Sequence, residues 1–455
     1  MKKTFITILA VSAGIFAISA CQKNLSDVQT SQVITKTVTV SETPWTADTK
    51  TAFTEADGVK LTGNEKMTVA YCKYTEGETL SGLTLVGKNT VGIAPADGKW
   101  SFTHDAIDGA TAYNYVFVLP YANQITDVNS AQTTLRLELP YIQYPSENSF
   151  DSGCDFLLGQ PQYNVSQKTE ISDVKFKRLF APLKVEISDS KNVLGDEKIR
   201  AVTFATDIAA DENALVGRVC FATFSSDYAK AQVGGWSEYP GNALTAFYGT
   251  GHTARNAWFI VSPRSVSKDT KVTLIVTTDS KTITRTATLT SDQAIKGETI
   301  NVIPFDISGD GYTVATTEFF DFNNITKADD IKSITGSNGT ASPWTHTNGS
   351  TIVEPMCFRL KYNSSSKKNA SLSLTSTKKV TKIRFYSQPR QPYQTGDVKL
   401  NDADGTVIST IYSVPAANGG YIDIDIPAEL QGSTIKLTAN TNISVFSGAT
   451  LFYGE

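Results

Sequence analysis

Histidine and cysteine are scarce in this chain of 455 residues. The three histidines, His104, His252 and His346, lie far apart in the sequence, and the five cysteines form no CxxC pair. A zinc site needs several such ligands at short spacing, and a disulfide framework needs a denser set of cysteines. We therefore expect no metal, no other cofactor and no disulfide network.

Charge is sparse too, because only 19% of the residues are charged and the formal net charge is −4. The lysines are scattered among carboxylates, so no basic field is available to attract nucleic acid. The sequence also lacks a Gly-rich phosphate loop, a GxSxG elbow and an HExxH motif. A catalytic arrangement of the distant histidines stays open, but we expect a protein that is not an enzyme.

The first twenty residues have the anatomy of a secretory signal. Lys2 and Lys3 precede an apolar run over residues 5–17, which is too short for a permanent spanning helix. Small residues then lead to Ile18-Ser19-Ala20-Cys21, which resembles the bacterial lipobox. We expect residues 1–20 to be removed and residues 21–30 to form a lipidated tether.

The resemblance to a lipobox implies acylation of Cys21 and anchoring by several acyl chains, which is what stable membrane attachment requires. Gln22 follows, rather than the aspartate that commonly retains lipoproteins at the inner membrane. The expected location is therefore the outer membrane, with the protein lipid-anchored and either surface-exposed or incorporated into a fimbrium. An ordinary signal peptide with a nearby cysteine is the alternative.

The remaining part of the chain, about 435 residues, is rich in threonine, serine, valine and isoleucine and has no long run of helix formers. Its length suffices for roughly three domains. Short alternating strands with turn residues between them predict an all-β protein of successive sandwiches. We place the boundaries at 31–168, 169–308 and 309–455, the last block being a β-sandwich or jelly roll.

Segments of the first two blocks resemble the fimbrillin-like family, lipoprotein precursors of pili in Gram-negative anaerobes. The resemblance covers residues 30–308 and depends on three stretches: Lys50-Thr-Ala-Phe-Thr with the hairpin that follows, Asp155-Phe-Leu-Leu-Gly-Gln with the strand after Val174, and Lys296-Gly-Glu-Thr-Ile-Asn-Val. It implies two tandem fimbrillin-like β-sandwiches. The third block lies beyond the shared region, so a plain stalk subunit is not expected.

The resemblance also implies a mechanism, assembly with other pilus subunits by β-strand exchange. Cleavage after a basic residue in the loop behind the first strand would free that strand and leave a sheet edge for a partner's strand. Here the first strand would be residues 31–40, the cut would follow Lys50, and Lys36 is the second choice. Alternatively, residues 31–40 are an ordinary edge strand and Lys50 is a solvated loop lysine.

A loop in the third block, residues 388–396, is rich in proline and amides. Its Arg390 and Tyr393, together with Trp344, His346 and Tyr386, could form a surface that binds a host or glycan ligand, because flat aromatic rings stack on sugars and amides bond to hydroxyls. The alternative is a connector with ordinary packing at the end of a sandwich.

These features favour a cell-surface lipoprotein, a fimbrial subunit or adhesin that assembles by strand exchange. One alternative is an outer-membrane glycan-binding lipoprotein that supports polysaccharide uptake. A second is a hydrolase acting on glycans, with the third block as its catalytic domain.

Overall fold

A computed structural model describes residues 33–40, 52–54, 58–60, 66–76, 84–85, 91–94, 99–119, 125–129, 134–209, 214–223, 232–238, 240–297, 299–347, 350–353, 357–361, 369–387, 398–402, 404–411, 419–439 and 443–454. These residues form an all-β protein, as the sequence predicts. Among these described residues, the 3-10 helices are η1 (Ser152–Cys154), η3 (Ala328–Ser333) and η4 (Ala428–Leu430). Within the described part, no helix is long and apolar enough to cross a membrane.

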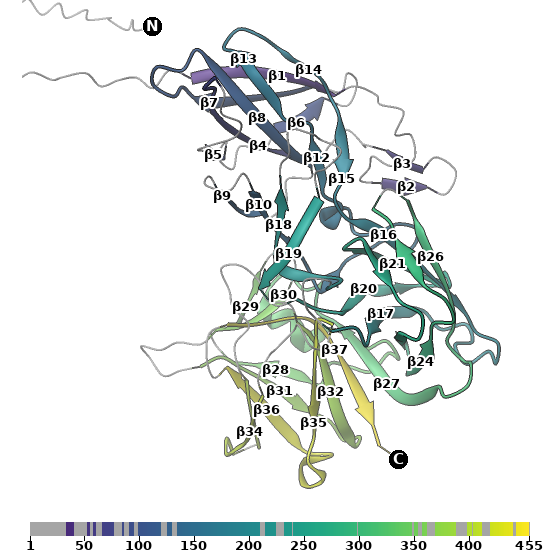
Figure 1. Cartoon of the computed structure of the whole chain (residues 1–455). Helices are drawn as coiled ribbons and strands as arrows, with labels where there is room; N and C mark the ends of the chain where they lie inside the picture. Colours follow the sequence, from purple (N-terminus) through teal and green to yellow (C-terminus); the bar gives the residue numbers. More distant parts are fainter. Residues whose placement is uncertain are drawn as a thin grey trace, which may run out of the picture.

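The first unit is built on a ten-stranded sheet, drawn at the top of Figure 1. Its main order is β14-β1-β7-β6-β4-β8-β12-β15, while β13 also pairs with β8 and β5 with β4. The strands are β1 (Val33–Val40), β4 (Lys66–Lys73), β5 (Thr84–Leu85), β6 (Val91–Ala94), β7 (Lys99–Asp105), β8 (Ala112–Leu119), β12 (Leu157–Gly159), β13 (Gln162–Ser166), β14 (Ile171–Val174) and β15 (Phe176–Arg178). A separate hairpin joins β2 (Ala52–Thr54) to β3 (Gly58–Lys60).

A four-stranded sheet, ordered β19-β18-β10-β9, combines strands from distant parts of the chain. Its members are β9 (Ile125–Asn129), β10 (Thr134–Leu139), β18 (Gly217–Thr223) and β19 (Gln232–Glu238). Because β10 pairs with β18, the chain between the first unit's strands is tied into the second unit.

The second unit contains a three-stranded sheet and part of an eleven-stranded one. The small sheet is ordered β21-β16-β26, and the large one runs β11-β20-β17-β23-β24-β27 before it continues into the third unit. The strands are β11 (Ile142–Gln143), β16 (Ala181–Ser188), β17 (Ile199–Thr206), β20 (Ala243–His252), β21 (Asn256–Val261), β23 (Lys271–Thr278), β24 (Lys281–Thr288), β26 (Asn301–Asp306) and β27 (Thr313–Asp321), with a side pair of β22 (Arg264–Val266) and β25 (Gln293–Ile295).

In the third unit, two sheets enclose their own core, which contains Phe320, Trp344 and Phe385. One sheet is the continuation β27-β37-β30-β29 with β32 and β35, and the other is ordered β28-β31-β36-β33-β34. The strands are β28 (Trp344–His346), β29 (Ser350–Val353), β30 (Cys357–Lys361), β31 (Ser371–Thr375), β32 (Val380–Ser387), β33 (Val398–Asn401), β34 (Val407–Ile411), β35 (Tyr421–Asp425), β36 (Thr434–Ala439) and β37 (Ile443–Tyr453).

The sheets place the domain boundaries differently from the sequence pattern. β14 pairs with β1 and β15 pairs with β12, so the first unit's sheet extends to Arg178 rather than ending at residue 168. No sharp boundary exists at residue 308 either, because β27 pairs with β24 over Thr313–Thr316 and with β37 over Thr317–Asp321. The second and third units therefore share one strand.

Candidate functional site

The first described strand, β1, lies inside its sheet rather than at an edge. It pairs antiparallel with β7, from Val33 opposite Asp105 to Thr39 opposite Lys99. On its other side it pairs in parallel with β14, where Val38 lies opposite Ile171. Figure 1 shows β1 beside these strands at the top of the molecule. The interpretation of residues 31–40 as an ordinary edge strand is therefore wrong.

One face of β1 fills the core of the first unit. Successive side chains on a strand alternate between its two faces, so Ile34, Lys36 and Val38 point the same way. All three are buried, and Ile34 and Val38 belong to the same hydrophobic cluster as Trp100 and Tyr115. Removing β1 would open a slot in this core and expose two sheet edges, those of β7 and β14. We call this space the β1 slot.

Lys36 is the unexpected member of that face, because its side chain is only 2% exposed. Its ammonium group donates to the backbone oxygens of Ser166 and of Thr169, the latter at 2.9 Å. The Nζ atom also lies 6.0 Å from the centroid of the Tyr115 ring. Burial lowers the pKa of Lys36 from its ordinary value.

Lys36, the second choice for cleavage, therefore lies in a position that a protease cannot reach. A protease needs an extended, accessible segment, whereas Lys36 lies in the middle of a paired strand with its side chain buried. The prediction of cleavage at Lys36 is therefore wrong, and this residue has a structural role instead. The first-choice residue, Lys50, lies outside the described residues, as does the proposed lipidation site, Cys21.

Aromatic and histidine side chains line the slot beside Lys36. The Nε2 atom of His104 lies 2.9 Å from the Tyr115 hydroxyl, and the rings of Tyr71 and His104 are 4.1 Å apart. Burial lowers the pKa of His104, although its contact with the Asp105 carbonyl opposes this shift. Burial also raises the pKa of Tyr115. The slot therefore holds His104 and Tyr115 neutral near pH 7, and Lys36 supplies its cation.

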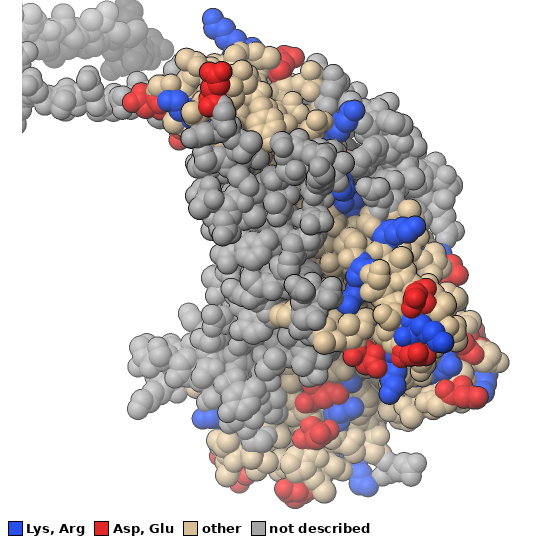
Figure 2. Space-filling model, viewed as in Figure 1, with Lys and Arg blue, Asp and Glu red and all other residues tan. Residues whose placement is uncertain are grey.

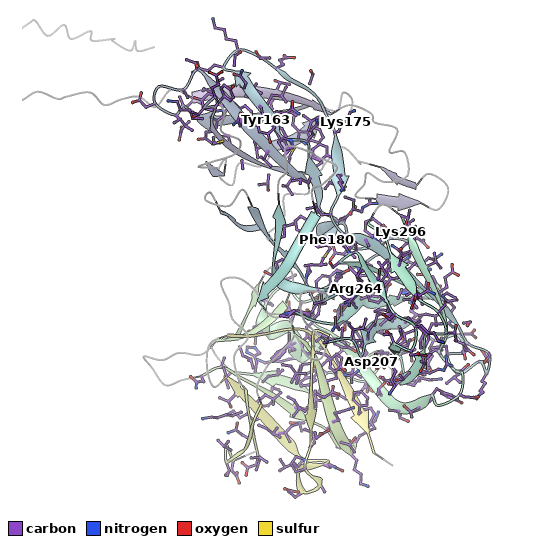
Figure 3. The ribbon with its side chains drawn as sticks, viewed as in Figure 1. Tyr163, Lys175, Phe180, Asp207, Arg264 and Lys296 are labelled. Atoms are coloured by element: carbon purple, nitrogen blue, oxygen red, sulfur yellow. The ribbon has the colours of Figure 1, made fainter. Side chains whose placement is uncertain are left out.

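The two stretches that suggest a join between the first two blocks do meet in space. Arg178 forms a two-pronged ion pair with Asp155, at 2.6 Å and 3.0 Å, and both side chains are almost fully buried. Next to this pair, Phe156 and Phe180 pack edge to face. Figure 3 places Phe180 where the first unit meets the second. Asp155 and Arg178 thus fix this junction.

A second junction lies between the second and third units. Tyr386 of β32 packs against Phe247 of β20 and Phe319 of β27, with ring centroids 5.3 Å and 5.9 Å away. The Tyr386 hydroxyl is 3.2 Å from the Oγ1 atoms of both Thr277 and Thr450. Tyr386 is therefore a buried interface residue and does not contribute to a ligand-binding surface, contrary to the sequence-based hypothesis.

Trp344 is also placed differently from the hypothesis. It is 1% exposed and packs edge to face against Phe320 and Phe322 in the third core, so no face of the ring is free to stack on a sugar. His346, two residues later on β28, contacts Asp329 at 3.2 Å. Arg390 and Tyr393 lie outside the described residues. The described members of the proposed set do not form one binding surface.

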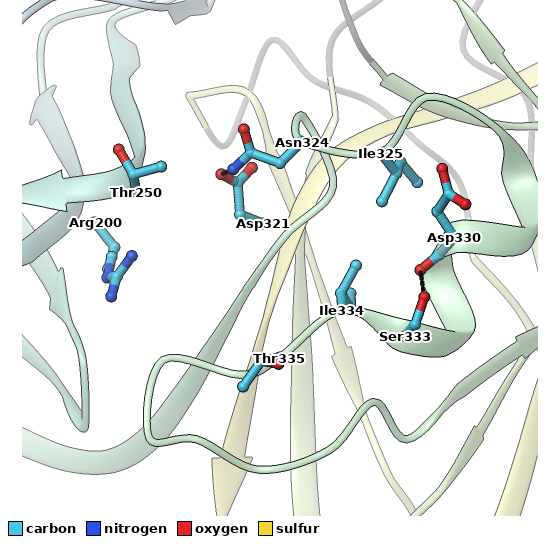
Figure 4. Close-up of a pocket in the computed structure, with 9 residues that line it drawn as sticks. All are labelled: Arg200, Thr250, Asp321, Asn324, Ile325, Asp330, Ser333, Ile334 and Thr335. Carbon is cyan, nitrogen blue, oxygen red and sulfur yellow. Dashed lines mark hydrogen bonds between the residues drawn. The ribbon is translucent and has the colours of Figure 1, made fainter.

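A pocket of about 520 Å³ lies beside the junction of the second and third units (Figure 4). Its lining is Arg200, Thr250, Asp321, Asn324, Ile325, Asp330, Ser333, Ile334 and Thr335. Arg200 is held by Asp279 at 2.7 Å, and Asp330 accepts the backbone N–H groups of Thr326 and Lys327 at 3.1 Å. Since none of the described residues that line the pocket is aromatic and these charges are already bonded, it is a weaker candidate site than the β1 slot.

Asp321, at the end of β27, is the unusual residue of this pocket. Its Oδ1 atom accepts the N–H of Asn323 at 2.9 Å, and Oδ2 accepts from the Asn324 side chain. Burial raises the pKa of Asp321 to about 6, despite the Asn323 N–H and the charge of Arg200. Gly249 lies alongside at φ +57°, and a Cβ there would lie 2.5 Å from the Asp321 Oδ2 atom, so a larger residue would be strained and would displace the carboxylate.

The surface charges do not indicate a separate binding site. On the face shown in Figure 2, blue and red residues are interspersed over the described parts of the second and third units. No group of three His, Cys, Asp or Glu side chains that could hold a metal ion occurs among the described residues.

The period-two alternation of residues 34–38 contains a signal for the buried lysine. Lys36 stands two residues from Ile34 and two from Val38, which places all three on one face. A basic residue at such a position is either buried or marks a solvated face, and only the partners of the strand decide between these outcomes.

No protein-family model and no curated protein matches this chain. Among solved structures, a candidate cell adhesion protein from Bacteroides uniformis matches 62% of this chain and 97% of its own, with 11% identity and a TM-score of 0.35. One from Bacteroides ovatus has 9% identity and the same TM-score, over 62% of this chain and 95% of its own. A candidate polysaccharide-binding protein from Bacteroides thetaiotaomicron has 10% identity and a TM-score of 0.25, over 53% of this chain and 76% of its own. These similarities are too distant to assign the chain to a family.

Proposed function

We propose that the protein is a cell-surface adhesin or fimbrial subunit that is delivered as a lipoprotein and accepts a partner's β-strand in the β1 slot. The position of β1 inside its sheet supports this proposal. The strand comes first among the described elements, yet it lies between β7 and β14 and contributes Ile34 and Val38 to the core.

The strand β1 pairs with two other strands and covers part of the core of the first unit. Its loss would leave unpaired backbone groups on β7 and β14 and uncover apolar side chains, including Trp100 and Phe102. A strand from another subunit can satisfy both needs at once, through ladder hydrogen bonds and through alternate side chains that enter the core. The vacated slot would therefore bind a partner's β-strand strongly.

The last strand, β37, favours an acceptor role over donation from this end of the chain. β37 pairs with β27, with β30 and with β32, and it contributes Phe446 and Leu451 to the third core. Withdrawing it would dismantle the third unit. In this proposal the third unit stays folded.

Protein recovered from the cell surface would test the proposal through the mass of its N-terminal peptide and its presence in sheared filaments. We expect a chain that begins after Lys50, or elsewhere in residues 41–51, and that co-purifies with filaments. An uncut chain that begins at acylated Cys21 and is absent from filaments would contradict the proposal. Saturable polysaccharide binding by that uncut chain would instead favour the glycan-uptake alternative.

A further inference from the structure

The β1 slot contains a polar site that an incoming strand must satisfy. The backbone oxygens of Ser166 and Thr169 converge on the Lys36 ammonium group from the segment around the end of β13. Neither oxygen belongs to β7 or β14, the strands that pair with β1. The backbone ladder of a new strand would therefore not bond to these two oxygens, and only one of its side chains can do so.

The surroundings of the site favour a cation. Carbonyl oxygens are acceptors only, and the Tyr115 ring presents its π-system 6.0 Å from the ammonium nitrogen. An apolar side chain at this position would lose two charge-assisted bonds to partly buried backbone oxygens, and only the Ser166 oxygen would keep another donor, the Thr169 N–H. An acidic side chain would add repulsion from the two carbonyl oxygens.

The positions two residues before and after Lys36 require apolar side chains. Ile34 and Val38 lie two residues to either side of Lys36, opposite His104 and Trp100 of β7, and both are buried. A shift of one residue would turn all three side chains to the other face. A shift of two would place the cation in an apolar position. The site therefore sets the register as well as the sequence.

We infer that the β1 slot selects a partner strand with the pattern apolar–x–basic–x–apolar, whose basic side chain replaces Lys36 at the Ser166 and Thr169 carbonyl oxygens. This inference rests on the proposed function, since it specifies which strand the vacated slot accepts. Thr35 and Thr37 face away from the core and carry none of the selectivity.

The test uses the whole chain with a specific protease site introduced within residues 41–51, cut after folding so that β1 stays in place until it exchanges. A fluorescent peptide with the sequence of residues 31–40 is added, and its uptake is followed by gel filtration. Unlabelled peptides then compete with it: the unchanged sequence, Lys36→Arg, Lys36→Met, and Thr35→Met as a control on the exposed face.

We expect the Lys36→Met peptide to compete about tenfold more weakly than the unchanged peptide, since two charge-assisted bonds to partly buried backbone oxygens are lost. The Lys36→Arg peptide should retain most of the affinity, and Thr35→Met should compete like the unchanged peptide. If Lys36→Met competes equally well, the inference is overturned while strand exchange stands. If even the unchanged peptide is never taken up, the proposed function fails and the inference with it.

Discussion

Replacing Asp321 by asparagine should stabilise the junction of the second and third units at neutral pH. In the folded protein the pKa of Asp321 is raised to about 6 by burial, from an ordinary value of 3.8. A carboxyl group with a raised pKa is penalised once it ionises. Its penalty is absent below about pH 4, grows between pH 4 and pH 6, and is complete above that range.

The size of the penalty follows from the shift, which corresponds to about 3 kcal/mol. The amide can still accept the Asn323 N–H through its oxygen, but it loses the acceptor that faces the Asn324 side chain. Such a loss costs about 1–2 kcal/mol. The expected net gain for Asp321→Asn is therefore about 1–2 kcal/mol at pH 7, fading to a small loss at pH 4.

Urea denaturation of the whole chain between pH 4 and pH 8 would measure this effect. Asp330→Asn is the matched control from the same pocket. Slight burial raises the pKa of Asp330, but the backbone N–H groups of Lys327 and Thr326 lower it by more. The pKa of Asp330 is therefore below its ordinary value. Its stabilising effect is present at neutral pH and is lost on acidification, so Asp330→Asn should not stabilise the protein. A loss of stability in Asp321→Asn that is the same at pH 4 and pH 7 would refute the reasoning.

Three further substitutions test the assigned roles of buried residues. Arg178→Met should destabilise the protein by about 3–5 kcal/mol, because it leaves Asp155 buried without its partner, and adding Asp155→Asn should recover part of that loss in urea denaturation. Trp344→Ala should lower stability by about 3–5 kcal/mol in the same assay, and a stable variant that lost glycan binding would show instead that the ring contacts ligand. Tyr386→Phe should cost about 1 kcal/mol, because only its bonds to two threonine hydroxyls are removed, and an unchanged urea midpoint would argue against them.

Alternation of apolar and polar residues predicts individual strands well in this chain. The apolar stretch at Tyr113 falls in β8, and the alternation from Tyr421 onwards falls in β35. Asn401, Asp402 and Gly405 are residue types that favour turns, and they lie where the chain passes from β33 to β34, with Gly405 at φ +92°. These features are local, so a short window of sequence contains the information that determines them.

Pairing between distant strands was not predictable in the same way. β1 meets β14 across more than a hundred residues, and β27 changes partners from β24 to β37 along its length. Alternation gives the face on which a side chain lies but not the strand that covers that face. For this reason the burial of Lys36, Trp344 and Tyr386 could not be read from the sequence.

A disulfide that locks β1 in its slot tests strand exchange most directly. Thr37 of β1 and Ser101 of β7 are paired, and their hydroxyl oxygens are 3.4 Å apart, so cysteines at both positions can form a disulfide. A matched control pair is Thr273 and Thr286 on β23 and β24, which are likewise paired across two strands. Both double variants carry the protease site within residues 41–51 and are cut after folding.

Uptake of the labelled peptide of residues 31–40 is then measured before and after reduction. Strand exchange in the β1 slot predicts that the oxidised Thr37→Cys/Ser101→Cys protein takes up no peptide, that reduction restores uptake, and that the control pair takes up peptide in both states. Equal uptake by the oxidised and reduced forms of the locked protein would contradict it, because the peptide would then bind somewhere other than the β1 slot.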